Sequence, residues 1–188
     1  MNEEISQDNF EQTEKIRAVD GFYEWIEAVI YAFVAIFIIF TFLFRIVGVD
    51  GNSMKNTLQD GNWLIVSNFN YSPKAKDIVV ITQPNVRHEP LIKRVIGVGG
   101  DKIDIDFVKG IVYVNDKAID EPYIAEPTVT RGDMKFPLVV PEGKVFVMGD
   151  NRNDSWDSRF SAVGFVDERY LMGKAVFRIF PFGDWKVS

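Results

Sequence analysis

The sequence contains no cysteine and only one histidine among its 188 residues. Disulfide frameworks, thiolate zinc sites, iron–sulfur centres and cysteine nucleophiles are therefore excluded or nearly so. An excess of basic residues is also lacking, because the formal net charge is −6 and the pI is about 4.9. Binding to phosphate backbones needs clustered Lys and Arg, so we expect no nucleic-acid partner.

Acidic residues are concentrated at the N-terminus. Residues 1–27 hold eight Asp and Glu against Lys15 and Arg17, whereas the rest of the chain is nearly neutral. Residues 2–20 have too little apolar surface to offset the entropy lost on ordering, so they are predicted to form a flexible or marginally helical tail. The whole chain is 47% hydrophobic, and its length is sufficient for one packed domain.

A long apolar run follows the acidic tail. Residues 28–44 contain no charged side chain and would rise about 25 Å as a helix, close to bilayer thickness once flanking residues are added. A buried core helix is disfavoured, because a chain of this size has nothing large enough to surround it. A cleaved signal peptide is disfavoured because the preceding tail is acidic and no small-x-small site follows. We predict a retained transmembrane anchor, whose orientation the balanced basic residues near its ends leave open.

The pattern after residue 49 is typical of strands. Short runs rich in β-branched and aromatic residues alternate with turns, and prolines interrupt any long helix. Lys109-Gly110 and Asn115-Asp116 are predicted to form hairpin turns. The predicted fold class is mainly β, an antiparallel sheet or barrel-like domain preceded by one transmembrane helix. The predicted strands cover residues 63–66, 77–82, 91–96, 102–106, 111–114, 144–148 and 174–180.

Three motifs that suggest other chemistries fail on inspection. Residues 97–102 begin like a dinucleotide-binding loop but have Lys102 where the third glycine belongs, so they are interpreted as a turn. The acidic stretch 150–157 lacks the glycine and glutamate spacing of a calcium loop, so no metal site is predicted. His88 lies in a polar, proline-flanked segment and is interpreted as a solvated loop residue, not as the base of a catalytic triad.

A serine nucleophile would therefore need a base other than histidine. Ser53 follows Gly51 and Asn52, which suit a tight turn that exposes the hydroxyl and directs backbone N–H groups. The same residues would also suit a plain loop between the anchor and the first strand. Because Ser53 lies eight residues after Arg45, an extended link places it within about 26 to 29 Å of the helix end. Any chemistry at Ser53 would take place near the membrane surface.

Lys93 is the matching candidate for the base. In a strand, Leu91, Lys93 and Val95 share one face. Burial of that face would desolvate the amine, lower its pKa and let it accept a proton from a serine hydroxyl. Arg94 lies on the opposite face between two isoleucines, so alternation does not decide which face is buried. An ordinary surface position for the Lys-Arg pair stays open.

The densest polar block, residues 149–159, directly follows an apolar strand. Its alternating Asp and Arg side chains predict a rigid, salt-bridged loop. Buried ion pairs stabilise little unless they are well satisfied, so such a block at a strand end favours scaffolding of a site over general stability.

Together these residues resemble the type I signal peptidases, the membrane-bound Ser/Lys endopeptidases of bacteria, in their compact single-anchor form. The resemblance covers residues 22–188 and depends on four motifs in the family's order. These motifs are residues 53–58, 61–66, 93–97 and 149–164.

The resemblance implies a role for each motif residue and requires no cofactor. Ser53 would be the nucleophile and Lys93 the general base that deprotonates it. Ser155 would orient the lysine amine, and the Ser53 backbone N–H would stabilise the oxyanion. The residues implied in a supporting ion-pair loop are Asp150, Arg152, Asp157 and Arg159.

Three positions depart from the family pattern. Gly51 stands where some members have a serine that adds a second oxyanion donor, so that donor would have to come from elsewhere. Asn56 and Gly99 stand where proline is usual, which makes both turns less rigid. These departures bear on substrate preference and subfamily, since Ser53 and Lys93 are intact.

The resemblance also implies a location and a substrate. Residues 1–21 would form an acidic cytoplasmic tail, residues 22–48 a single-pass anchor in the cytoplasmic membrane, and residues 49–188 an extracytoplasmic peptidase domain. The implied activity is removal of signal peptides from exported preproteins, whose small-x-small cleavage sites emerge from the lipid bilayer. Two alternatives stay open: a specialised peptidase for pilin-like or other surface precursors, and a non-catalytic membrane-anchored binding domain.

Overall fold

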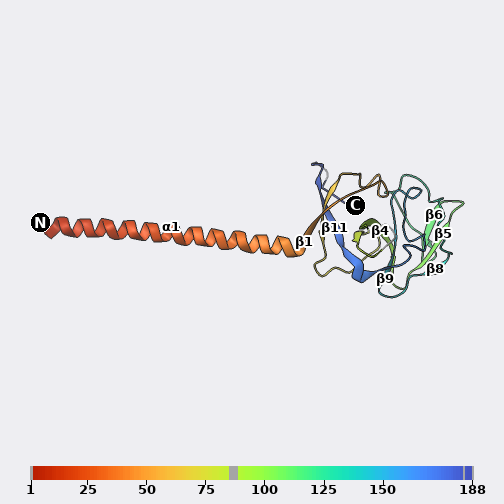
Figure 1. Cartoon of the computed structure of the whole chain (residues 1–188), viewed down its shortest axis with the longest axis horizontal. Coiled ribbons are helices and arrows are strands. Elements are labelled where there is room, and N and C mark those ends of the chain that lie inside the picture. Colours follow the sequence, from red (N-terminus) through yellow and green to blue (C-terminus); the bar gives the residue numbers. More distant parts are fainter. Residues whose placement is uncertain (1, 85–88, 184, 188) are drawn as a thin grey trace. The chain divides into compact units, whose positions relative to one another are not determined.

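The computed structural model describes residues 2–84, 89–183 and 185–187 (Figure 1). The chain divides into two units, Met1–Phe42 and Leu43–Ser188. Helix α1 (Asn2–Leu43) accounts for the first unit. The predicted acidic tail over residues 2–20 is therefore helical and continuous with the apolar run.

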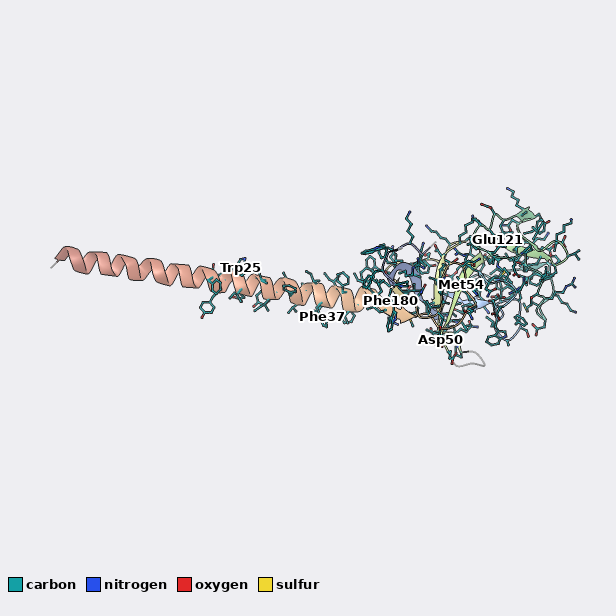
Figure 2. The ribbon with its side chains drawn as sticks, turned by 90° about the horizontal axis from the view of Figure 1, so that it is seen from above. Trp25, Phe37, Asp50, Met54, Glu121 and Phe180 are labelled. Atoms are coloured by element: carbon teal, nitrogen blue, oxygen red, sulfur yellow. The ribbon has the colours of Figure 1, made fainter. Side chains whose placement is uncertain are left out.

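The C-terminal half of α1 is long and apolar enough to cross a membrane. This stretch, Gly21–Leu43, has 23 residues, and none of its most apolar window is buried. Trp25 and Phe37, seen beside the helix in Figure 2, are 63% and 70% exposed. The consecutive residues 36–40 are each about half exposed or more, so within the described part of the chain no side of this stretch is buried. Such a helix is suited to lipid and poorly suited to water.

The helix ends five residues before the predicted end of the anchor. Residues 44–48 form strand β1 (Phe44–Gly48), which pairs antiparallel with β2 (Trp63–Ser67) from Phe44↔Ser67 to Gly48↔Trp63. A short apolar run is compatible with either a helix or a strand, and here pairing with β2 decides the outcome.

The second unit contains two antiparallel sheets. The larger sheet has the strand order β1-β2-β11-β3-β4-β9-β10, and the smaller has the order β7-β6-β5-β8. This confirms the prediction of a mainly β, antiparallel fold with one N-terminal helix. The remaining strands of the larger sheet are β3 (Ile78–Ile81), β4 (Leu91–Val98), β9 (Lys144–Met148), β10 (Val166–Asp167) and β11 (Leu171–Phe180). The smaller sheet consists of β5 (Lys102–Asp106), β6 (Ile111–Val114), β7 (Lys117–Ala118) and β8 (Leu138–Val139).

The predicted strands all occur. The predicted hairpin turn at Asn115 and Asp116 is confirmed. Asn115 and Asp116, between β6 and β7, both have positive φ, at 53° and 63°. This is the pattern of a type I′ hairpin turn, which Asn and Asp tolerate. The predicted turn over residues 97–102 begins later, because β4 continues to Val98 and the chain reverses at Gly100, with φ 87°.

Strand β4 is buried on both of its faces. Ile92 belongs to one core cluster together with Met54 and Leu58. Val95 belongs to a second cluster that includes the neighbouring strands β3 and β9, and Ile96 belongs to a third that extends to the smaller sheet. Because hydrophobic clusters cover both faces, side chains of β4 that point in either direction lie away from water.

Candidate active site

Strand β4 brings Lys93 into direct contact with Ser53. Lys93 Nζ lies 2.8 Å from Ser53 Oγ and 3.0 Å from the carbonyl oxygen of Ile92. Lys93 is only 3% exposed, and Arg94, on the opposite face by strand alternation, is 2% exposed. Strand alternation could not decide which face of β4 is buried, because both faces are buried. Of the two side chains, Lys93 is the one that contacts Ser53.

Ser53 is presented by a hydrogen-bonded turn that comes after β1. The Leu58 backbone N–H donates to the Met54 carbonyl at 2.8 Å, and the Lys55 N–H donates to the Asn52 carbonyl at 2.9 Å. Met54 and Leu58 are 1% and 0% exposed and belong to the core. Met54, directly after the serine, is therefore packed in the core. The hydrogen bond from the Lys55 N–H to the Asn52 carbonyl closes the predicted tight turn.

Ser53 and Lys93 line a cleft of about 610 Å³. A volume of this size is typical of a ligand-binding cleft. Three segments that are far apart in the sequence contribute to its lining, together with two single residues. They are residues 47–54, residues 89–93 and residues 153–156, with Thr130 and Phe160.

Asp150 links β4 to the Ser53 turn. Its carboxylate accepts hydrogen bonds from Arg94 Nε and Nη2, at 2.8 and 2.7 Å, and from the Thr57 hydroxyl at 2.5 Å. The next residue, Asn151, donates its backbone N–H to the Ser53 carbonyl oxygen at 3.0 Å. Asp150 is 0% exposed, so this bidentate pair with Arg94 is shielded from water and well satisfied.

The block over residues 149–159 is salt-bridged, as predicted, but with different partners. Asp157 and Arg159 pair within the block at 2.8 Å and are both 0% exposed. Arg152 instead pairs with Glu121, which lies 31 residues earlier in the chain. Asp150 pairs with Arg94, as described above. No local spacing in the sequence indicates Glu121 or Arg94 as partners, because both contacts are long-range.

Ser155 lies beside the backbone of the nucleophile candidate. A Cβ atom placed at Gly149 would lie 2.2 Å from Ser155 Oγ and 2.4 Å from the Ser53 carbonyl oxygen, so both oxygens pack against Gly149. Ser155 Oγ is buried and has no hydrogen-bond partner among the residues that the structure describes. The predicted lysine-orienting hydroxyl is thus at the cleft but makes no hydrogen bond to Lys93.

Two carboxylates of the stretch that resembles a calcium loop are engaged by arginines, Asp150 by Arg94 and Asp157 by Arg159, and the third, Asp154, is exposed. Within residues 2–84, 89–183 and 185–187, no group of three or more His, Cys, Asp or Glu side chains is placed to hold a metal ion. His88, interpreted from the sequence as a loop residue, lies outside the described residues.

Known proteins resemble this chain over most of its length. The family model described as "Signal peptidase, peptidase S26" matches residues 22–180. The chain belongs to the peptidase S26 family. Signal peptidase I of Bacillus licheniformis is 38% identical over 178 residues, which cover 88% of this chain and 92% of that protein. Signal peptidase IB of Staphylococcus aureus (strain MRSA252) is 37% identical over 182 residues, 88% of this chain and 93% of that protein.

A solved structure extends the comparison. The crystal structure of a signal peptidase I from Enterococcus faecalis V583 is 30% identical in sequence, with a TM-score of 0.46, and covers 55% of this chain and 97% of that chain. Membership of the S26 family confirms the resemblance drawn from the four motifs and makes the chain a serine endopeptidase of the signal peptidase type. The single N-terminal apolar helix fits a membrane-anchored S26 enzyme.

One departure from the family pattern has a clear conformational basis. Asn56 adopts φ +87°, a left-handed conformation in which Asn is among the best tolerated of the non-glycine residues. Proline is locked near φ −65° and cannot adopt it. In this S26 chain the turn after Ser53 is therefore built around asparagine, and proline at this position would not rigidify it.

We expect Asn56→Pro to lower the free energy of unfolding by about 1 kcal/mol or more, because proline is incompatible with the native φ. Asn56→Gly, which suits a positive φ, serves as the matched control and should stay within about 1 kcal/mol of the parent. Urea unfolding followed by tryptophan fluorescence measures both values. A proline variant more stable than the parent would show that the turn has a different backbone conformation in solution.

Gly149→Ala should disrupt the site, because the new Cβ has no space between Ser155 Oγ and the Ser53 carbonyl oxygen. We expect a loss of about 1–3 kcal/mol in stability and of about 10²-fold in kcat/KM, the effect of a displacement near 1 Å at reacting groups. Peptide cleavage and urea unfolding measure the two effects. Gly21→Ala is the control, since nothing lies within 4 Å of its Cβ position; equal activity of both variants would contradict the packing described.

Proposed function

We propose that the chain removes signal peptides from exported preproteins, with Ser53 as the nucleophile and Lys93 as the general base. The observation that carries this proposal is the 2.8 Å contact between Lys93 Nζ and Ser53 Oγ at the wall of a cleft. Burial of the amine favours its neutral form, which can accept the hydroxyl proton. The S26 family assignment and the named relatives support the substrate class.

The geometry supports a two-step acyl transfer. Lys93 Nζ takes the proton of Ser53 Oγ as that oxygen attacks the carbonyl carbon of the scissile peptide bond. The tetrahedral oxyanion is stabilised by the Ser53 backbone N–H. The Lys93 ammonium then donates its proton to the leaving amine, which departs as the N-terminus of the mature protein. In the second step, Lys93 Nζ takes a proton from a water molecule whose oxygen attacks the acyl carbon. The ester bond to Ser53 Oγ then breaks, and the Lys93 ammonium returns the proton to that oxygen, which restores both groups.

The remaining motif residues would position this pair. Ser155 lies at the cleft, and its buried hydroxyl is available to hold the amine when substrate is bound. Asp150 holds the Ser53 turn to β4, and Arg152, Asp157 and Arg159 stiffen the loop that carries both Asp150 and Ser155. Their contribution is orientation, since reacting groups need geometry within a fraction of an ångström.

The substrate would be an extended segment with small side chains at the first and third positions before the cut. Its hydrophobic segment stays in the bilayer, so the cleavage site reaches the enzyme near the membrane surface. In this proposal residues 1–21 are cytoplasmic, the apolar part of α1 spans the membrane once, and the β unit is extracytoplasmic. The exposed apolar side chains of residues 36–40 support the membrane assignment.

A cleavage assay tests the proposal. The intact chain in detergent should cut a synthetic preprotein segment directly after the second alanine of an Ala-x-Ala site, as located by mass spectrometry. Ser53→Ala should abolish the cut, because it removes the hydroxyl oxygen that the proposed mechanism acylates. Cleavage of pilin-like precursors only would support the specialised alternative, and no cleavage of any preprotein by folded enzyme would refute the proposed activity.

A further inference from the structure

A three-residue segment that lies outside the four motifs in the sequence packs against two arginines of the site, Arg94 and Arg152. It comprises Glu121, Pro122 and Tyr123, and it lies in the irregular chain between β7 and β8. The Tyr123 ring lies under two guanidinium groups, with Arg94 Cζ 3.9 Å and Arg152 Cζ 5.9 Å from its centroid. The Tyr123 hydroxyl donates to Glu121 Oε1 at 3.2 Å.

Glu121 binds this segment to the block over residues 149–159 through Arg152. Its carboxylate accepts hydrogen bonds from both terminal nitrogens of Arg152, and its side chain is 6% exposed. Burial alone would lower the pKa of Arg152, but the hydrogen bonds and charge of Glu121 outweigh it and raise that pKa. Burial, with the charge of Glu121, also raises the pKa of the Tyr123 phenol, which stays protonated. The ion pair between Glu121 and Arg152 therefore holds the segment in place.

Tyr123 covers the part of Arg94 that hydrogen bonds leave open. The edges of the guanidinium are used by Asp150 and by the carbonyl oxygen of Lys76, which accepts from Nη1 at 2.9 Å. The planar face is stacked on the tyrosine ring, a favoured arrangement for arginine. Hydrogen bonds to its edges alone would allow the guanidinium plane of Arg94 to tilt, whereas stacking on the Tyr123 ring fixes the orientation of that plane.

The orientation of Arg94 bears on both members of the dyad. Arg94 directly follows Lys93 in β4, so it anchors the strand segment that carries the amine. Its partner Asp150 accepts the hydroxyl of Thr57, in the same turn as Ser53. A shift of this one guanidinium would therefore move the base and the nucleophile relative to each other.

We propose that Tyr123 is a positioning residue for the Ser53 and Lys93 pair, acting through the stacked guanidinium of Arg94 and held in place by Glu121. The aromatic ring is the operative group, and the hydroxyl has a lesser part. This inference rests on the proposed function of the dyad, and it predicts that loss of the ring impairs chemistry more than substrate binding.

The test uses the full chain in detergent with the Ala-x-Ala peptide. It compares the parent with Tyr123→Leu, Tyr123→Phe and the control Tyr113→Leu, and Glu121→Gln provides a fourth variant.

Tyr123→Leu removes the ring, and we expect kcat to fall about tenfold or more with KM within about twofold. The acid limb of its kcat profile should move to higher pH, because a loosened amine is better hydrated. Tyr123→Phe keeps the ring and should retain kcat within about threefold. Tyr113→Leu, a half-buried tyrosine of β6, is the matched control and should behave as the parent.

Glu121→Gln keeps the proposal testable if Tyr123→Leu does not fold, since it retains the shape of the segment while weakening its hold on Arg152. It should lower kcat about threefold or more with KM unchanged. The proposal is overturned if the leucine variant keeps the parent kcat and pH profile, if the phenylalanine variant is impaired equally, or if Glu121→Gln has the parent kcat. Failure of the proposed function is a separate outcome, recognised when the parent chain itself does not cleave or when Ser53→Ala still does.

Discussion

Lys93→Met should lower kcat for preprotein cleavage by about 10³-fold, within the range that a general base contributes to acyl transfer. Methionine has nearly the length of lysine and lacks the amine, so it fills a site that is 3% exposed without a new cavity. Stability should be maintained, because the variant no longer buries an amine. Steady-state cleavage and thermal unfolding of the same preparation measure the two properties.

Lys174→Met is the matched control for this experiment. Lys174 also lies in the larger sheet, on β11, but its half-exposed ammonium pairs with Asp77 and lines no part of the cleft. It should keep the parent kcat. A Lys93→Met enzyme with kcat within about tenfold of the parent would place the general base on another residue.

Asp150→Ala should be the most destabilising of the substitutions considered, lowering the free energy of unfolding by about 3–5 kcal/mol. The change leaves the guanidinium of Arg94 buried at 2% exposure without its carboxylate, and it leaves the Thr57 hydroxyl without its acceptor. Activity should fall with stability, because the same carboxylate joins β4 to the Ser53 turn. Urea unfolding of the full chain in detergent gives the free energy.

Two comparisons isolate the cause of that loss. Asp116→Asn removes the charge of the exposed pair with Lys102, keeps a residue type that tolerates the positive φ of this turn, and should leave the unfolding midpoint unchanged. The double variant Arg94→Met with Asp150→Leu removes both buried charges and should recover part of the stability but not the activity. A single Asp150→Ala variant as stable as the parent would mean that water reaches Arg94.

The sequence predicts most of this fold because its strands carry strong local signals. The runs that became β5, β6 and β9 have the predicted bounds, since turn residues such as Asn115 and Gly110 mark their ends. Strand β1 was assigned to the anchor, because an apolar run continuous with a helix shows no local sign of changing structure. The two-residue strands β7, β8 and β10 were not predicted, as two residues contain no periodicity.

The candidate site was predictable only as far as motifs describe it. Ser53 and Lys93 were identified from turn chemistry and family resemblance, and the structure brings them to 2.8 Å. The contacts of Glu121 with Arg152 and of Tyr123 with Arg94 were not predicted. They join residues tens of positions apart, and Glu121 and Tyr123 lie in irregular chain, where neither periodicity nor motif spacing indicates a partner.

Lys93 and Arg94 occupy successive positions of a strand whose two faces are both buried, and this makes strand register a determinant of acid–base chemistry. In the observed pairing Lys93 lies opposite Val79 of β3, and Arg94 lies opposite Met148 of β9. A slip of one residue would exchange the two faces. Ser53 would then meet a guanidinium, which does not give up its proton at any physiological pH, and Asp150 would meet the amine. The ladder hydrogen bonds on either side of β4 thus select which of the two adjacent basic side chains faces Ser53, and only the lysine can lose its proton and serve as the proposed base.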